Sequence, residues 1–191
     1  TVFGGAGNDS ITGGAGVDYI TGGEGNDTLQ GNDNNDNLDG GGGNDSLTGG
    51  ADGDTLQGGD GNDTVAGNGG TDFLRGGNGN DLFTIAAADS GTAAGSLDQI
   101  LDWEATDALD FAVIGAATDG VNYIELTAST YDAALTLANT QIANGNDYVV
   151  IQVGADVVVF ADTGNNNGTA EDAVALVGRT LADISAGNIA I

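Results

Sequence analysis

Cysteine, histidine, methionine, proline and lysine are all absent from this chain of 191 residues. Without histidine and cysteine, these residues cannot form a zinc-binding HExxH motif, a cysteine nucleophile or a Ser-His-Asp triad. Paired carboxylates could in principle act on glycosidic bonds, but no cleft residues of mixed type accompany them, so we expect no enzyme activity here. The absence of cysteine also fits an exported protein that avoids oxidative mispairing.

Positive charge is nearly absent as well. Arg75 and Arg179 are the only basic residues against 29 acidic ones, so the formal net charge is −27. Such a surface repels the phosphates of nucleic acids and of anionic lipids. No apolar run reaches the roughly 18 residues that a membrane-spanning helix needs. The sequence therefore predicts neither a nucleic-acid partner nor membrane insertion.

What the chain does contain is a tandem repeat. Across residues 4–84, nine units of nine residues follow one another without an insertion. They are GGAGNDSIT, GGAGVDYIT, GGEGNDTLQ, GNDNNDNLD, GGGGNDSLT, GGADGDTLQ, GGDGNDTVA, GNGGTDFLR and GGNGNDLFT. Every unit has Gly at position one and Asp at position six. Position eight is always apolar, and its residues are Ile11, Ile20, Leu29, Leu38, Leu47, Leu56, Val65, Leu74 and Phe83.

Each part of the unit favours a different local structure. Positions one to four suit a tight turn, because glycine accepts positive φ at no steric cost. Of the residues that replace glycine in these positions, four tolerate such angles better than most residues do, and they are Asn32, Asn34, Asp52 and Asn68. Positions seven to nine are rich in Thr, Leu, Ile and Val, which predicts a strand of about three residues with position eight pointing inward.

So short a strand needs neighbours to be stable. Two units would make one coil of about 18 residues, and successive coils would stack as parallel strands about 4.8 Å apart. The sequence therefore predicts an all-β fold in which residues 1–84 form a solenoid around a thin aliphatic core.

Charge opposes this stacking. Thirteen Asp and one Glu in the nine units face the single Arg75, and stacking places the position-six carboxylates in two columns. Two like charges about 4 Å apart repel by roughly 1 kcal/mol in water and about 4 kcal/mol at an effective dielectric of 20. A hard divalent cation removes the conflict, since Ca²⁺ takes about six to eight oxygens from carboxylates and carbonyls. Folding of the repeats should then depend on calcium.

The alternative for a tract rich in Gly, Asn and Asp is a disordered, solvated linker. A linker has no reason to keep an apolar residue at every ninth place. We therefore expect an ordered solenoid in calcium and disorder without it.

These units resemble the hemolysin-type repeats of the RTX (repeats-in-toxin) family, whose members leave bacteria by type I secretion. The resemblance implies a right-handed parallel β-roll, in which each calcium ion lies between two turns on the same side, two units apart. The carbonyls of positions two and four and the Asp of the first turn would face the carbonyls of positions one and three and the Asp of the second.

Applied to this chain, the resemblance implies seven sites. The first four pair Gly5, Gly7 and Asp9 with Gly22, Glu24 and Asp27; Gly14, Gly16 and Asp18 with Gly31, Asp33 and Asp36; Gly23, Gly25 and Asp27 with Gly40, Gly42 and Asp45; and Asn32, Asn34 and Asp36 with Gly49, Ala51 and Asp54. The last three pair Gly41, Gly43 and Asp45 with Gly58, Asp60 and Asp63; Gly50, Asp52 and Asp54 with Gly67, Gly69 and Asp72; and Gly59, Gly61 and Asp63 with Gly76, Asn78 and Asp81. Units four and eight depart most from the pattern.

Residues 85–191 lose the nine-residue period and are predicted to cap the exposed end of the solenoid. Residues 97–111 resemble the segment that follows the roll in serralysin-type RTX proteins, where acidic residues complete the last calcium site. By that resemblance the chain would have an eighth site, formed by Asn68, Gly70, Asp72, Asp89 and Asp98. The alternative is a solvated edge strand with Trp103 in the core of the cap.

The rest of the cap is predicted to be mainly β with one short helix. Thr130 can N-cap a helix over residues 131–143, which Asn144 and Gly145 would end. The apolar stripe of that helix would consist of Ala134, Leu135, Leu137, Ala138 and Ile142. Strands are predicted at residues 148–153, 157–161 and 173–177, the first two joined by a hairpin loop.

Two further segments remain open to more than one interpretation. Residues 162–172 have the alternating Asp and Asn of a calcium loop without the spacing of an EF-hand, so an ordinary turn is an equal alternative. The tail, residues 180–191, is similar to the export signal of type I substrates, although an apolar terminal strand would look the same. At the other end, the chain begins at position seven of an incomplete unit, which indicates the carboxyl-terminal part of a longer protein.

The leading functional hypothesis is a calcium-binding module of a secreted bacterial protein. It would stay unfolded in the low calcium of the cytosol and fold outside the cell, with a structural role such as adhesin or surface (S-layer) assembly. The alternative is the non-catalytic secretion and folding tail of an extracellular protease, lipase or epimerase whose catalytic domain lies upstream. The expected partners are calcium ions, the type I secretion machinery and other copies at the cell surface.

Overall fold

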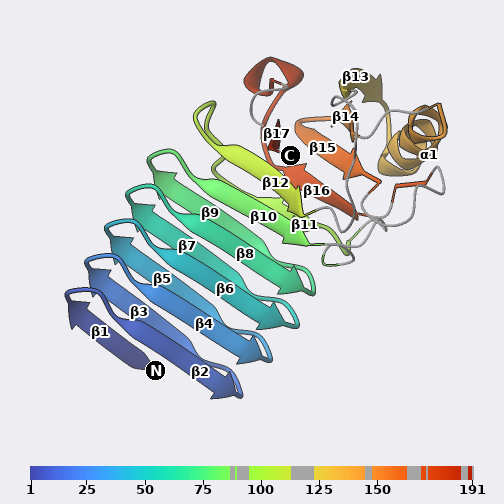
Figure 1. Cartoon of the computed structure of the whole chain (residues 1–191). Coiled ribbons are helices and arrows are strands. Elements are labelled where there is room, and N and C mark those ends of the chain that lie inside the picture. The colour runs from blue at the N-terminus through green and yellow to red at the C-terminus, as the bar shows by residue number, and fades with distance from the viewer. Residues whose placement is uncertain are drawn as a thin grey trace.

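The computed structural model describes residues 1–86, 89, 95–112, 123–144, 148–162, 169–170, 172–185 and 189–190. Within them the chain forms a stack of flat coils, closed at one end by a smaller group of strands and one helix (Figure 1). The strands of the stack, called the roll below, are β1 (Val2–Ala6), β2 (Ser10–Ala15), β3 (Tyr19–Glu24), β4 (Thr28–Asp33), β5 (Asn37–Gly42), β6 (Ser46–Ala51), β7 (Thr55–Asp60), β8 (Thr64–Gly69), β9 (Phe73–Asn78) and β10 (Leu82–Ala86).

The register of these strands confirms the two-unit coil. Ile11 pairs with Leu29 and Leu38 pairs with Leu56, each one coil apart, in parallel strands. Odd-numbered strands of the roll form one sheet in the order β1-β3-β5-β7-β9, and even-numbered strands form the other in the order β10-β8-β6-β4-β2. The predicted all-β parallel solenoid is therefore confirmed.

The strands of the roll are longer than predicted. Most have six residues, because they continue from positions seven to nine into positions one to three of the next unit. Gly14, for example, pairs with Asn32, and Ala15 pairs with Asp33. The prediction of about three residues was wrong because it counted glycine as a strand breaker. The backbone of the adjacent coil provides hydrogen-bond partners for these residues, even though their side chains do not favour a strand.

The backbone angles confirm the glycine substitutes. Positive φ occurs at positions two and four of all nine units, and its non-glycine cases are Asn32, Asn34, Asp52 and Asn68. These are the residues that the sequence indicated. Positions one and three have no positive φ within the units, so the turn needs special angles at two places and not at four.

Position eight supplies the core of the roll. Its side chains from Ile20 to Phe83 are at most 1% exposed and belong to one hydrophobic cluster, to which both sheets contribute. Val2 holds the same place in β1 but is 40% exposed, because β1 has a neighbouring strand on one side only. Stability of each coil therefore depends on the coils beside it.

The cap continues both sheets. Its elements are β11 (Asp98–Ile100), β12 (Ala108–Ala112), β13 (Tyr123–Ala128), α1 (Tyr131–Ile142), β14 (Tyr148–Val153), β15 (Asp156–Ala161), β16 (Asp172–Leu176), the 3-10 turn η1 (Leu181–Asp183) and β17 (Ile189–Ala190). The first sheet runs on from β9 through β11, β16, β15 and β14 to β13, and the second runs from β10 through β12 to β17. The predicted division after residue 84 remains a prediction, since parallel pairing crosses it.

Local predictions for the cap agree with the structure. The Thr130 hydroxyl accepts the Ala133 N–H at the start of α1, as an N-cap does. Ala134, Ala138 and Ile142 are buried against β14 and β15. The three predicted strands occur within one residue of their expected bounds, and the first two form an antiparallel hairpin. Gly145 and most of residues 162–172 lie outside the described residues, so the helix stop and the loop are not placed.

Among the described residues, no helix has the length and apolar character needed to cross a membrane.

Candidate calcium sites in the turns

The turns between the two sheets bury the aspartates of position six. Asp27, Asp36, Asp45, Asp54, Asp63, Asp72 and Asp81 are at most 3% exposed. Asp9 and Asp18, in the first coil, are half-buried. Below, the odd column is Asp9, Asp27, Asp45, Asp63 and Asp81, and the even column is Asp18, Asp36, Asp54 and Asp72. Their turns are called odd and even in the same way. A buried aspartate must find hydrogen-bond donors or a cation, because an unpaired buried charge is costly.

From Asp27 to Asp81, one oxygen of each position-six carboxylate accepts a backbone N–H of the preceding coil. Oδ1 of Asp27 accepts the backbone N–H of Asp9 at 2.8 Å, and Oδ1 of Asp45 accepts that of Asp27 at 2.7 Å. The even column repeats the pattern, since Oδ1 of Asp36 accepts the N–H of Asp18 at 2.8 Å. Position-five asparagines form a second ladder at the surface, where the Asn8 amide oxygen accepts the Asn26 N–H. These contacts fix the side-chain direction of position six.

The other carboxylate oxygen has no donor. In the described parts of the roll, a buried Oδ2 without a hydrogen-bond partner occurs in Asp9, Asp27, Asp36, Asp45, Asp54, Asp63, Asp72 and Asp81. Buried polar atoms normally have a hydrogen-bond partner, so unpaired carboxylate oxygens that recur from turn to turn need an explanation. A hard cation such as Ca²⁺ fits, because it binds carboxylate and carbonyl oxygens.

Glycine at position one makes room for that oxygen. A Cβ on Gly4 would lie 2.5 Å from Oδ2 of Asp9 and 2.6 Å from the carbonyl oxygen of Gly22 in the next coil. The same two neighbours surround Gly22, Gly31, Gly40, Gly49 and Gly58. The prediction that position one needs glycine for its backbone angle was therefore wrong. Its glycine is needed because a side chain would fill the space between carboxylate and carbonyl.

Carbonyls of positions two and four point along the stack. A Cβ on Gly23 would collide with the carbonyl oxygen of Gly5, and one on Gly25 would collide with that of Gly7. The position-three carbonyl of Glu24 accepts the N–H of Gly7 at 2.7 Å. The structure thus brings the two turns of the first predicted site face to face, and the equivalent contacts recur at Gly41, Gly43, Gly59 and Gly61.

Burial raises the pKa of the position-six aspartates from Asp36 to Asp81. The pKa of Asp54 rises to about 7 and those of Asp63 and Asp72 to about 6, chiefly because burial removes water and also because neighbouring aspartates repel. Backbone N–H donors lower the pKa and offset part of this effect. Ionised carboxylates are therefore unfavourable here unless a positive charge joins them.

Backbone oxygens must supply most ligands of any ion in these turns. Among the described residues, no group of three or more Asp or Glu side chains converges as a carboxylate cluster would. Each turn contributes one aspartate and several carbonyls, a combination that calcium accepts readily.

The RTX calcium-binding nonapeptide repeat, as a family model, matches this chain in four overlapping copies. They cover residues 1–29, 13–47, 21–56 and 48–83. Residues 1–83 are an RTX calcium-binding repeat region. The nine-residue units of this chain are therefore repeats of a calcium-binding type.

Solved structures similar to the chain include two bacterial proteins. One is the solution structure of the AlgE6R3 subunit from the Azotobacter vinelandii mannuronan C5-epimerase, with 26% identity, a TM-score of 0.37, and coverage of 98% of this chain and 80% of that one. The other is the extracellular lipase LipA from Serratia marcescens, with 17% identity, a TM-score of 0.39, and coverage of 99% of this chain and 39% of the lipase. No curated protein matches the chain.

Asp98 extends the even column of the RTX roll into the cap. Its Oδ1 accepts the N–H of Asp72 at 2.9 Å, as the next repeat would. It is fully buried in β11, between β9 and β16, so the alternative of a solvated edge strand was wrong, although Trp103 is indeed in the core. Burial raises the pKa of Asp98 to about 8, and the nearby charges of Asp72 and Asp89 add to the shift. The structure therefore places Asp72 and Asp89 near Asp98, although the three carboxylates do not converge as a carboxylate cluster would.

Asp107 extends the odd column, which sequence reasoning missed. Its Oδ1 accepts the N–H of Asp81 at 3.2 Å, and the N–H of Ala108 donates to the Asp81 carbonyl as in the repeats. A signal was present, because Asp98-Gln99-Ile100 and Asp107-Ala108-Leu109 lie nine residues apart with an apolar residue at position eight. Ile100 and Leu109 pair with Leu74 and Phe83 of the core.

Proposed function

We propose that the chain is a calcium-loaded module of a secreted bacterial protein, which keeps its roll unfolded at low calcium and folds it outside the cell. One observation carries this proposal: eight buried carboxylate oxygens of the described roll have no hydrogen-bond partner. In all of these carboxylates except that of Asp9, the other oxygen accepts a backbone N–H of the preceding coil, which fixes the direction of the carboxylate. Folding of the coils and binding of the cations are then thermodynamically coupled.

The ions would lie in the seven turn pairs that the repeat pattern defines, with an eighth at Asp72, Asp89 and Asp98. Support comes from the facing turns, where Asp9 Oδ2 and the Gly22 carbonyl oxygen border the same space beside Gly4, and the Gly5 and Gly7 carbonyls point toward the next coil. In the even turns, Asn32, Asn34, Asp52 and Asn68 also have positive φ, between 62° and 86°. The carbonyl oxygens of Asn32 and Asp52 still point toward Gly50 and Gly70 of the next coil, as the glycine carbonyls do in the odd turns.

The difference in calcium concentration between the cytosol and the outside of the cell would control folding of the roll. Extracellular calcium modules bind with dissociation constants of about 10⁻⁴ to 10⁻³ M, far above cytosolic calcium. At a free concentration ten times the dissociation constant, each site stabilises the folded state by about 1.4 kcal/mol, and several sites add. Repulsion within the two columns would keep the chain unfolded during export, and calcium would fold it afterwards.

Circular dichroism across a calcium titration tests this proposal. In chelator we expect little strand signal, and in about 10 mM Ca²⁺ we expect the full signal of the roll. A strand signal of equal strength in both conditions would refute the calcium dependence. Crystals grown in calcium would then count the ions, because anomalous peaks should lie between the seven facing turns.

A structural role in surface assembly completes the proposal. The high negative charge keeps single molecules apart, and calcium reduces that repulsion once the roll is loaded. Negative-stain images should show ordered arrays in calcium and none in chelator. Single particles in both conditions would favour the non-catalytic tail of an extracellular enzyme.

A further inference from the structure

The loop between β11 and β12 follows the spacing of the repeat but not its composition. With Asp107 at position six, Asp102 takes position one and Thr106 position five, and no glycine is present between them. The loop crosses from the first sheet to the second, as the odd turns do, and its flanking strands pair with β9 and β10. It is therefore the next odd turn of the stack.

Its backbone differs from every turn of the roll. Each of the nine units has positive φ at positions two and four, whereas no residue from Asp102 to Asp107 has it. The Asp107 N–H donates to the Glu104 carbonyl at 3.1 Å, which closes a short turn of its own. The carbonyls of this loop are thus not arranged as in the calcium-binding turns.

Side chains of the loop bond the ninth unit directly. The carboxylate of Asp102 accepts the N–H groups of Gly76 and Gly77 at 3.1 and 3.2 Å. The Thr106 hydroxyl donates to the carbonyl of Gly79 at 3.1 Å. Gly79 is at position four, whose carbonyl points at the next coil in the other turns.

Asp107 also differs from the aspartates of the roll. Its Oδ2 accepts the Glu104 N–H at 2.7 Å, while its Oδ1 accepts the Asp81 N–H. Both of its oxygens have protein donors, in contrast to the unpaired Oδ2 atoms of the roll. Here the protein supplies the contacts that calcium would supply elsewhere.

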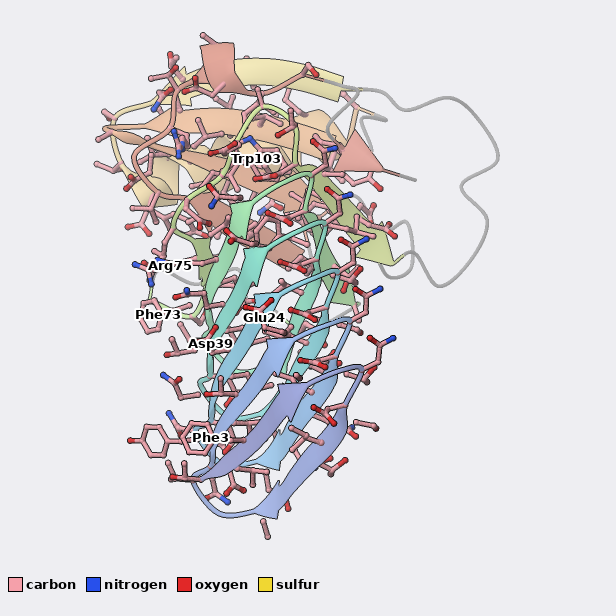
Figure 2. The ribbon with its side chains drawn as sticks, turned by 90° about the vertical axis from the view of Figure 1, so that its left-hand side faces the viewer. Phe3, Glu24, Asp39, Phe73, Arg75 and Trp103 are labelled. Carbon is pink, nitrogen blue, oxygen red and sulfur yellow. The ribbon has the colours of Figure 1, made fainter. Side chains whose placement is uncertain are left out.

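The loop also anchors the single tryptophan of the chain. Trp103 is 1% exposed, its ring centroid lies 6.2 Å from that of Phe83, and its indole N–H donates to the Asp183 carbonyl at 3.4 Å. Figure 2 shows Trp103 within the cap, away from the outer face where Phe3, Asp39 and Phe73 project. Its fluorescence therefore reports on the junction between roll and cap.

We propose that Asp102 and Thr106 take the place of a calcium ion in this last odd turn, so that protein contacts alone hold the junction. The inference rests on the proposed calcium dependence of the other turns. It has two consequences. The odd column binds no ion beyond Asp81, and the junction stays closed when chelator opens the rest of the roll.

Trp103 emission and far-UV circular dichroism, recorded together while calcium is added to the full chain in EDTA, test the second consequence. We expect the strand signal to grow with calcium while the emission stays at the short wavelength of a buried indole throughout. Emission of a solvated indole in EDTA, shifting with the same midpoint as the strand signal, would overturn the inference. A strand signal that does not change with calcium would refute the proposed function instead. The proposal for the junction would then be tested by the Trp103 emission of the variants described next.

Two variants test the residues, with Thr136→Val in α1 as the matched control. Thr136 also donates its hydroxyl to a backbone carbonyl, that of Asp132 at 2.9 Å, but lies on the helix surface. In EDTA, Asp102→Asn and Thr106→Val should shift Trp103 emission to longer wavelength, and Thr136→Val should not. In saturating calcium, all three should bind as many ions as the unchanged chain, counted by native mass spectrometry. Loss of an ion in either junction variant, or unchanged emission in EDTA, would overturn the proposal.

Discussion

The backbone N–H of Asp54 donates to Oδ1 of Asp72 at 2.7 Å, across 18 residues of sequence. In the same way, Oδ1 of Asp54 accepts the backbone N–H of Asp36 at 2.7 Å. Asp36, Asp54 and Asp72 thus each accept an N–H from the preceding coil and donate their own N–H to the aspartate of the following one. The column behaves as a chain of coupled positions, which is why a single substitution should affect two turns.

Asp54→Asn should weaken two calcium sites, because Asp54 belongs to the pairs on both of its sides. Asparagine keeps an oxygen for the Asp36 N–H but loses the charge that attracts the ion. We expect the calcium midpoint of folding to rise several-fold and the bound ions to fall by one or two, measured by isothermal titration calorimetry.

Asp39→Asn is the control for that variant, since it removes the same charge from position nine on the outer face (Figure 2). Its midpoint should stay close to that of the unchanged chain. Equal effects from the two variants would show that net charge alone, and not site geometry, controls folding.

Gly58→Ala should destabilise the roll even in saturating calcium. The added Cβ would lie 2.6 Å from the Gly76 carbonyl oxygen and still closer to Oδ2 of Asp63. Backbone and carboxylate must both move, so the free energy of unfolding should fall by about 1–3 kcal/mol or more in urea denaturation.

Gly42→Ala provides the comparison. Gly42 has no positive φ, and the nearest atom to its added Cβ is the flexible Glu24 Oε2 at 3.4 Å. We expect a change within about 0.5 kcal/mol. If Gly58→Ala were equally mild, the space argument for position one would be wrong.

The pH dependence of the metal-free chain follows from the buried aspartates. Burial raises the pKa of Asp54 to about 7 and of Asp98 to about 8, both above the ordinary 3.8. The folded state therefore binds protons more tightly than the unfolded state. Its stability is greatest below about pH 4 and is lost as the pH rises through about 6 to 8.

In chelator, the strand signal should thus be larger at pH 4.5 than at pH 8. Circular dichroism at each pH checks this, with light scattering to confirm that the chain stays monomeric near its pI of about 4.1. A signal that grows with pH in chelator would contradict the assignment of these shifts.

Removal of residues 185–191 should block type I export while calcium folding of the roll persists. The tail ends in β17, where Ile189 is buried and pairs with Leu109 of β12, so some loss of cap stability is expected. Ile189→Ala separates the two effects, because it keeps the tail but removes the packing. Normal secretion of the deletion, measured in culture medium, would show that the export signal lies elsewhere.

Much of the roll could be predicted from sequence because its contacts repeat. A nine-residue period places Leu38 against Leu56 and Asp27 beside Asp45 as soon as two units are taken as one coil. Asn32, Asn34, Asp52 and Asn68 could be assigned their angles for a similar reason, since they stand where other units have glycine. Strand length could not be predicted, because glycine pairs in a ladder only when a neighbouring coil is present.

The sequence by itself determined the period, the aspartate columns, the positive φ of Asn32, Asn34, Asp52 and Asn68, and the inward direction of position eight. Only the tertiary structure decided why position one is glycine, that Asp98 and Asp107 continue the columns, and that Asp102 and Thr106 bond the ninth unit. The physical reason is the range of the interactions. Backbone angles and side-chain alternation depend on a few adjacent residues, whereas these contacts form between residues 18 or 25 to 27 places apart and exist only when coils and cap are stacked.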